Sequence, residues 1–435
     1  MSDKPVYTRR RFMQSGLVVV STASTIPTFL QHSAVALADP LDTPRITSLP
    51  GVPQDRILIV VQLSGGNDGL NTVVPYGHRG YYDTRPGIAV PQSQALRLGG
   101  KADNQGVGFH PSLANLKDMI DNGLAAVVQG VGYPNPNRSH FASMDIWHTC
   151  QMRSRRGTGW LGRAMDQFTF EKNAAMVAIG NKAPLACIGE HGAPVSFENA
   201  NLFRWAGADL HKTLGKHYEQ INRAGVLSGI GEDAIEATSQ AAFVMRTALD
   251  AQLVSDRIRA AVAKGTITNF PDGQLANQLR MVASMIRAGL PTRVYYVGLG
   301  GFDTHSGQLG RHANLLREFA SAMQAFYREL KAMGDDGRVL SMAFSEFGRR
   351  VRQNASQGTD HGTAGPMYLF GPMVRPGLLG EHPSLSELDN GDLIYNIDFR
   401  SVYAAVLDTW LKTDSRKILG LAFRHARVLD AKVKA

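Results

Sequence analysis

Acidic and histidine side chains follow three apolar runs of this 435-residue chain. Carboxylate oxygens and imidazole nitrogens are common ligands of divalent metal ions in proteins. Each set of these side chains comes at the end of an apolar run or one loop later. The sequence therefore predicts a divalent metal site whose candidate ligands are, in chain order, Asp68, Asp303, His305, Glu346, Asp360 and His361.

The apolar runs themselves are typical of buried strands, and segments with helical spacing lie between them, such as Ser112–Asn122 and Asn314–Met333. This alternation predicts an α/β fold with a mainly parallel central sheet and helices on both faces. Parallel strands bring their carboxyl ends to one edge, where open α/β folds bind ligands. The predicted strands are 57–63, Leu124–Val131, Ala175–Ile179, 294–299, 338–344 and Tyr368–Phe370.

The domain organisation follows from the remaining segments. Residues 39–55 are rich in Pro and Asp and are expected to form a linker to a single domain, 56–435. Residues 190–290 contain long helical patterns and no convincing strand, which favours a helical insertion or cap beside the site. The turn back to the core is predicted at Phe270-Pro-Asp-Gly273.

The N-terminus has the pattern of an export signal. Thr8–Gln14 matches the twin-arginine pattern of two arginines, one free position, Phe and a further apolar residue. A moderately apolar stretch, Leu17–Leu30, is too short and too rich in Ser and Thr for a bilayer span. Ala36-Leu-Ala38 is a small-x-small cleavage site. We expect residues 1–38 to be a signal peptide, cut after Ala38, that directs the protein through the twin-arginine export machinery to the periplasm or outside the cell.

Composition narrows the possible partners. The net charge is +9 and falls when the basic N-terminal segment is removed, so the mature chain is mildly basic and compatible with anionic substrates. Nucleic acid is not expected as a partner of an exported chain without a long basic block. No later apolar run has membrane length, so no transmembrane segment is expected in the mature chain. Cys150 and Cys187 could pair in an oxidising compartment, but the sequence does not show whether they meet.

Several short motifs, taken together, resemble a known family. They look like the exported bacterial family catalogued as domain of unknown function 1501, which in turn resembles the alkaline phosphatase-like superfamily of phosphatases, sulfatases and cofactor-independent phosphoglycerate mutases. The resemblance covers nearly the whole mature chain. It rests on Leu63-Ser-Gly-Gly-Asn-Asp-Gly-Leu-Asn71, Asn137-Arg-Ser-His-Phe141, Gly301-Phe-Asp-Thr-His305, Ser345-Glu-Phe-Gly-Arg349, Gly358-Thr-Asp-His-Gly362 and Asp398-Phe-Arg-Ser-Val-Tyr403.

The resemblance implies an α/β/α sandwich and two divalent metal ions, usually zinc, manganese or calcium. It also implies a Ser, Thr or formylglycine nucleophile that attacks a phosphoryl or sulfuryl group of a small-molecule or polymer ester. Asp68 would bind one metal, while Asp303 and His305 would bind the other, although their spacing is two residues instead of the usual four. The alternatives are an Asx cap for Asp68 and a helix N-cap for Asp303.

The third ligand set allows two alignments. In one, Asp360-His361-Gly362 matches the superfamily's Asp-His-Gly motif directly. In the other, which we prefer, Glu346 and Phe347 take the place of that Asp and His, and His361 matches the last metal-binding His. Phe347 then removes a nitrogen ligand from the site. Glu346 could instead form a salt bridge to Arg349 or Arg350.

The expected nucleophile lies at a helix start after the second strand. Ser139 is the best candidate, with Arg138 or His140 as partners of the oxyanion or leaving group, and Ser143 is second. Ser139 could instead simply cap the helix. A formylglycine sulfatase is not favoured, because Cys150 lacks the Cys-x-Pro-x-Arg pattern.

Together these features predict an exported, metal-dependent hydrolase of phosphate or sulfate esters. The opposing hypothesis is a non-catalytic periplasmic binding or assembly protein that retains the fold, and Phe347 and the short spacing between Asp303 and His305 favour it. A one-metal site that only stabilises the fold is a third possibility.

Overall fold

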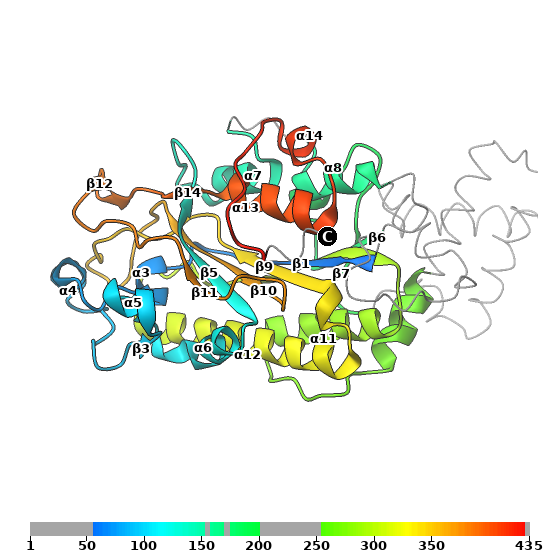
Figure 1. The fold of residues 1–435 in the computed structure, drawn as a ribbon, viewed down its shortest axis with the longest axis horizontal. Helices are drawn as coiled ribbons and strands as arrows, with labels where there is room; N and C mark the ends of the chain where they lie inside the picture. The colour runs from blue at the N-terminus through cyan, green and yellow to red at the C-terminus, as the bar shows by residue number, and fades with distance from the viewer. Residues whose placement is uncertain (1–54, 153–156, 169–174, 201–253, 431–435) are drawn as a thin grey trace, which may run out of the picture.

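The apolar runs form one large sheet at the centre of the molecule (Figure 1). The computed structural model describes residues 55–152, 157–168, 175–200 and 254–430. In this part of the chain the sheet has nine strands in the order β11-β5-β10-β9-β1-β8-β6-β7, with β14 also paired to β5. Their bounds are β1 Ile57–Leu63, β5 Ala125–Gly132, β6 Ala175–Ile179, β7 Val195–Phe197, β8 Thr292–Leu299, β9 Val339–Phe344, β10 Gly365–Phe370, β11 Gly377–Leu379 and β14 Ile397–Asp398.

Strand direction places the candidate site residues at one edge. β1 pairs parallel with β8 and β9, so that Gln62 lies between Gly298 and Phe344. Among the described strands of this sheet only β10 runs antiparallel, between β9 and β5. The carboxyl ends of β1, β5, β8 and β9 and the amino end of β10 therefore meet at the same edge, as predicted for a ligand site of a parallel sheet.

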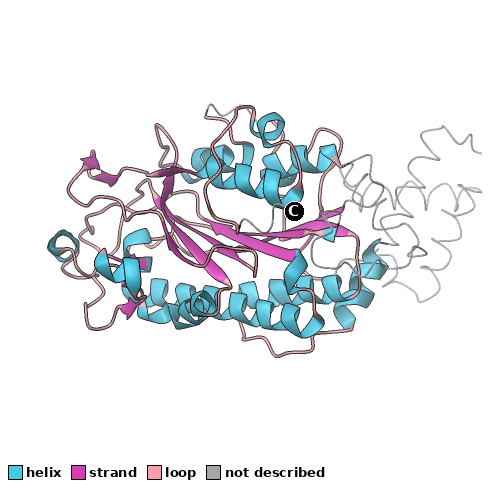
Figure 2. Ribbon diagram, in the orientation of Figure 1, coloured by secondary structure: helices cyan, strands magenta, loops and turns pink. Residues whose placement is uncertain are grey.

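Helices cover both faces of the sheet (Figure 2). β1 is apolar at almost every position because both of its faces are buried: Ile57, Ile59 and Val61 pack into one core and Leu58 and Val60 into the other. One layer contains α6 (Ala114–Asp121), α11 (Gln274–Arg287) and α12 (Gln308–Met333). The opposite layer contains α7 (His140–Thr149), α8 (Trp160–Gln167), α13 (Phe399–Ala405), the π-helical turn η6 (Val406–Leu411) and α14 (Ser415–Leu419).

The remaining elements lie beside this core. The short helices are α3 (Gly69–Thr72), α4 (Arg79–Thr84) and α5 (Gly100–Asn104), and 3₁₀ turns occur at Pro111–Leu113, Leu185–Cys187 and Asp336–Arg338. A small three-stranded sheet is formed by β2 (Val73–Val74), β4 (Gly108–Phe109) and β3 (Leu96–Arg97), and a hairpin by β12 (Leu388–Asp389) and β13 (Asp392–Leu393).

The predicted α/β class and mainly parallel sheet are confirmed, and all six predicted strands are present with shifts of a few residues at their ends. The expectation that 190–290 holds no strand is wrong at Val195–Phe197, because β7 extends the sheet beside β6. α11 is also part of the core: Leu275, Leu279 and Val282 are fully buried in it. The predicted signal peptide, 1–38, nearly all of the linker, 39–55, and residues 201–253 of the insertion lie outside the described residues.

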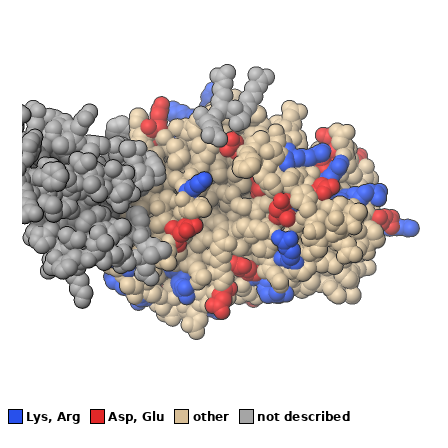
Figure 3. Space-filling model, turned by 180° about the vertical axis from the view of Figure 1, so that it is seen from behind, with Lys and Arg blue, Asp and Glu red and all other residues tan. Residues whose placement is uncertain are grey.

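The surface of the molecule carries charged side chains of both signs. In the view from behind, basic and acidic side chains lie side by side over a mostly uncharged surface (Figure 3). None of the described helices is long and apolar enough to cross a membrane. Cys150 and Cys187 are both buried and free, and burial raises the pKa of the Cys150 thiol to about 12.

Candidate metal centre

The Asp303 carboxylate lies at the centre of three imidazole rings from three different elements. Asp303 and His305 follow β8, His140 begins α7, and His361 precedes β10. The Nε2 atoms of His305 and His361 are each 3.1 Å from Asp303 Oδ1, and His140 Nε2 is 3.5 Å from Asp303 Oδ2. Ligand atoms of His140, Asp303 and His361 all lie within 4.8 Å of one another, a spacing that one metal ion could bridge.

The other nitrogen of each ring is held by an oxygen outside the cluster. Carboxylates and carbonyls accept hydrogen bonds only, and each ring has such an oxygen at both of its nitrogens: Asp303 at Nε2 and an outer acceptor at Nδ1. His305 Nε2 and His361 Nε2 are only 2.9 Å apart. Two imidazole nitrogens at this distance need one proton or one cation between them. The outer acceptors are Glu346 Oε1 for His140 at 2.8 Å, Asp360 Oδ1 for His305 at 3.2 Å and the Arg138 carbonyl for His361 at 2.8 Å.

Glu346 orients His140 from a buried position. Besides His140, its Oε1 accepts the backbone N–H of Gly65 at 2.8 Å, and its Oε2 accepts Ser345 Oγ at 3.1 Å. The hydrogen bond that His140 donates to Glu346 raises the pKa of His140. The salt bridge expected as an alternative for Glu346 is not formed to Arg349, whose guanidinium reaches Asp303 instead.

Phe347 packs against the histidine cluster and offers no ligand atom. Its ring centroid is 4.7 Å from that of His361 and 5.0 Å from that of His140. The side chain that replaces the superfamily's nitrogen ligand in our preferred alignment therefore packs against two of the three imidazoles and restricts their orientation.

Arg349 is the residue of this site that the sequence did not single out as functional. It is fully buried and donates to Asp303 Oδ1 at 2.6 Å and to the carbonyl oxygens of Gly66 and Thr359. Burial acts to raise the pKa of Asp303, but the hydrogen bonds from Arg349 and His361 prevail and lower it to about 2. Its place in Ser345-Glu-Phe-Gly-Arg349 was the available signal, but sequence alone could not show its target.

Asp68 lies apart from this arrangement, in a buried network of its own. Its side chain caps α3 by accepting the N–H groups of Leu70 and Asn71, as the Asx-cap alternative expected. It forms a buried ion pair with Arg85 at 2.6 Å and also accepts Gln308 Nε2. Burial acts to raise the pKa of Asp68, but Arg85 lowers it overall. Both oxygens have donors within the chain, and metal binding by Asp68 stays a prediction.

The helix-cap alternative for Asp303 does not describe the structure, because α12 begins at Gln308 with Gly307 as its N-cap. His312, seven residues after His305, is buried in α12 and bonded through Nε2 to Asn67 Oδ1 at 2.9 Å. It therefore belongs to the network around Asp68.

The candidate nucleophile lies next to the cluster in sequence. Ser139 is exposed at the N-cap position of α7, and within the described residues its side chain makes no cap hydrogen bond. Ser143, the second candidate, is buried and bonded to Tyr133 and to the Glu346 carbonyl at 2.5 Å, so its hydroxyl has a structural partner. The Arg138 guanidinium pairs with the buried Asp392, which leaves its backbone carbonyl as the contact to the cluster.

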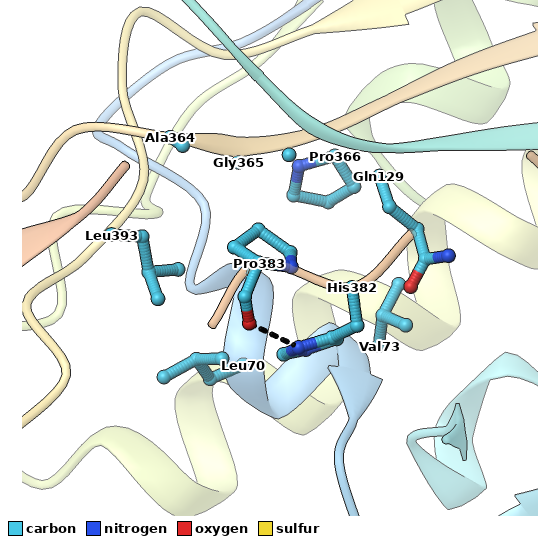
Figure 4. A pocket seen from close by; sticks show the side chains of 11 residues that line it. Leu70, Val73, Gln129, Ala364, Gly365, Pro366, His382, Pro383 and Leu393 are labelled. Carbon is cyan, nitrogen blue, oxygen red and sulfur yellow. Dashed lines mark hydrogen bonds between the residues drawn. The ribbon is translucent and has the colours of Figure 1, made fainter. Parts of the chain in front are cut away.

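A small apolar cavity near the amino end of β10 is not a ligand site. Figure 4 shows the side chains of Leu70, Val73 and Pro366 around it, with His382 bonded to the Pro383 carbonyl. Its volume of about 20 Å³ has room for roughly one water molecule, far less than a ligand pocket.

The sequence matches the family described as Protein of unknown function (DUF1501) over residues 55–419. The chain belongs to this family. The prediction of family membership is thereby confirmed. The search of curated proteins found no match for this DUF1501 chain.

Solved structures similar to this DUF1501 chain include a protein in the alkaline phosphatase superfamily from Vibrio parahaemolyticus, with 9% identity, a TM-score of 0.36 and coverage of 88% of this chain and 76% of that one. A sulfatase from Pseudoalteromonas sp. has 11% identity, a TM-score of 0.34 and coverage of 84% and 68%. A phosphonate monoester hydrolase from Silicibacter pomeroyi has 10% identity, a TM-score of 0.30 and coverage of 86% and 78%. Likenesses of this degree carry no conclusion about chemistry.

The donor set of this DUF1501 protein fits a divalent transition metal. Three imidazole nitrogens and one carboxylate are suited to zinc or manganese, whereas calcium prefers oxygen ligands. Outer acceptors on each Nδ1 are the arrangement that orients histidine ligands in metal sites. Arg349 is the feature that opposes a cation, since it already neutralises part of the charge of Asp303.

Proposed function

We propose that this DUF1501 protein is an exported, metal-dependent hydrolase of phosphate or sulfate esters. The observation that carries the proposal is the convergence of three imidazole Nε2 atoms on the Asp303 carboxylate. His140, Asp303, His305 and His361 would hold the metal ion. Glu346, Asp360 and the Arg138 carbonyl would act as the outer partners that keep the rings in place.

A divalent ion bound here would neutralise charge on the oxygens of a transferring phosphoryl or sulfuryl group. The chain's own groups would do the rest. Ser139, at the start of the ten-residue helix α7, would supply the attacking hydroxyl, and the N–H groups of the first helical turn would point toward the anion. Glu346 would hold the His140 ring through Nδ1, so that Nε2 keeps its direction toward Asp303. Arg349 would fix the Asp303 carboxylate against the loop after β1.

The first test is metal content. The mature protein, purified without chelator, is expected to contain tightly bound zinc or manganese that is lost in an Asp303→Ala/His361→Ala double variant. A His78→Ala/Asp83→Ala double variant is the matched control, because it removes one exposed His and one exposed Asp from outside the cluster. Equal metal content in all three proteins would rule out the proposed metal centre.

Hydrolysis is tested on chromogenic aryl phosphate and aryl sulfate esters. Wild-type protein loaded with metal is expected to turn over one of the two, and Ser139→Ala is expected to abolish it while leaving the metal in place. Turnover that persists unchanged in Ser139→Ala would remove the nucleophile assignment and leave the metal centre standing.

The second candidate function is a non-catalytic periplasmic binding or assembly protein. Phe347, in the place of a nitrogen ligand, and Arg349, on the carboxylate of the cluster, favour it. Bound metal without hydrolysis of any ester of either class is the result that this function predicts.

Export is part of the same proposal, and Thr8–Gln14 and the cleavage site at Ala38 support it. Replacing the two arginines of the signal with lysines is expected to keep the protein in the cytoplasm with residues 1–38 uncut. Cleaved, exported protein from this variant would contradict the twin-arginine route.

A further inference from the structure

A groove lined by arginines runs along the outer edge of the central sheet, at β11. It consists of two overlapping cavities of about 660 and 600 Å³. One wall is β11 with the preceding Arg375, and the other is the chain segment 424–430, which follows α14. The two cavities share Arg375, Leu379, His425, Ala426 and Arg427.

Backbone hydrogen bonds fix the position of both walls. Arg375 donates its N–H to the Val428 carbonyl at 2.9 Å, and Ala426 donates to the Ser401 carbonyl of α13 at 3.0 Å. The His425 ring is held by Asp408 through a 2.6 Å contact. The segment that carries Arg424 and Arg427 is therefore tied to the sheet edge on one side and to the helical layer on the other.

The arginines of the groove have an excess of positive charge. Arg375, Arg424 and Arg427 are all exposed, and none of them has an acidic partner among the described residues. The Arg375 side chain donates to the Arg427 carbonyl at 3.5 Å. The acidic lining residues are Asp398, which Arg400 already holds, and Asp430 at the end of the described segment.

Residues that adjoin the groove in sequence line a second cavity near the histidine cluster. Asn396 and Asp398 line the groove, while the residues just before them, Leu393–Tyr395, line a neighbouring cavity of about 100 Å³. That second cavity is bounded by Asn135 and Pro136, which lead into Arg138, and by Thr363, two residues after His361. A chain lying in the groove could thus extend toward the cluster along residues 393–398.

We propose that this groove binds a linear polyanion that carries repeated sulfate or phosphate groups. Guanidinium groups match such oxyanions with two parallel N–H···O bonds, and three of them along one channel suit repeated charges better than a single small anion. Identifying the polyanion as the ester substrate rests on the proposed function. In that case the enzyme acts on polymers, and the groove holds the part of the chain that is not being cleaved.

Binding is measured by calorimetry with a short sulfated oligosaccharide and with a polyphosphate chain of similar length, each at two salt concentrations. An Arg375→Gln/Arg424→Gln/Arg427→Gln variant is expected to bind one of them about tenfold more weakly or worse, since it loses three charge-assisted contacts. Its dependence on salt is expected to be shallower, because fewer counterions are released. The preferred probe distinguishes sulfate from phosphate as the charged group.

The matched control is Arg79→Gln/Arg280→Gln/Arg311→Gln, which removes the same charge from exposed positions outside the groove. It is expected to bind within about twofold of wild type. Equal weakening in both triple variants would show attraction by overall charge, and absence of binding to wild type with either probe would overturn the groove as a site.

Failure of the groove and failure of the proposed function give different results. The groove variant is expected to hydrolyse a small aryl ester at the wild-type rate and to have a raised KM for the polymer only. Small-ester hydrolysis with unchanged polymer affinity in the variant would overturn the groove proposal alone. Polymer binding at the groove without hydrolysis of any ester would overturn the proposed function alone.

Discussion

Two acidic clusters of this molecule, one around Asp68 and the other around Asp303, lie at the same edge of the sheet and differ in what completes them. Asp68 is fully buried and has Arg85, Gln308 and two backbone N–H groups as partners. Asp303 is part-exposed, and besides Arg349 it faces the Nε2 atoms of three imidazole rings.

Asp68 has its partners within the chain, whereas the cluster around Asp303 is left open to a proton or a metal ion. A buried carboxylate must be paired in the folded protein, and Asp68 is paired by the chain alone. Around Asp303 the histidines are arranged so that a proton or metal ion is needed to separate their nitrogen atoms. The first cluster should therefore control folding stability and the second should control metal content.

Asp303→Asn is expected to have the largest effect on function. It removes the central charge of the cluster, so metal should be lost and ester hydrolysis should fall by about a hundredfold to a thousandfold. The buried Arg349 loses its acidic partner but keeps its bonds to backbone carbonyls, so the free energy of unfolding of the metal-free protein should fall by about 1–2 kcal/mol. Elemental analysis measures the metal content, and urea unfolding in the presence of chelator measures the stability of the metal-free protein. Retained metal in Asp303→Asn would contradict the assignment of Asp303 as a metal ligand.

Asp68→Asn is the converse test. It leaves the buried Arg85 charge uncompensated, so the free energy of unfolding should drop by about 3 kcal/mol, with the folded fraction keeping its metal. Urea unfolding and elemental analysis measure both. Loss of metal from a protein that remains folded would place Asp68 in the metal site after all.

A pH dependence of stability should come from the Asp68 side of the comparison. Burial lowers the pKa of His312 to about 4, so the folded protein keeps this ring neutral while the unfolded chain protonates it near pH 6.5. The unfolded state then binds more protons between these values, and stability is lost as pH falls from about 6.5 to about 4. The expected loss from this residue is about 3 kcal/mol.

The measurement is urea unfolding of the metal-free protein at several pH values. His312→Gln, which keeps a donor for Asn67, should flatten the dependence between pH 6.5 and 4. Identical slopes in the variant and the wild type would show that other groups control acid stability.

The sequence predicted the strands better than it predicted the partners of each acidic residue. Long apolar runs such as 57–63 predict the strand positions, because such runs are typical of buried strands. β7 was missed because Val195–Phe197 is only three residues long and gives no periodic signal. Asp68 and Asp303 both follow strands, and no local pattern shows that Arg85 reaches the first and Arg349 the second.

Removing the contact between Asp360 and His305 is expected to have the smallest effect on metal binding. Asp360 Oδ1 accepts from His305 Nδ1 at 3.2 Å and from Asn354 Nδ2 at 3.1 Å, but its side chain is 55% exposed. Asp360→Ala lets the ring choose its tautomer, so zinc affinity should fall by about tenfold, the lower end for outer partners of histidine ligands. A competition titration with a chromophoric chelator measures it. Asp389→Ala, an exposed acid outside the cluster, is the control, and equal affinities in the two variants would show that Asp360 does not orient His305 for a metal ion.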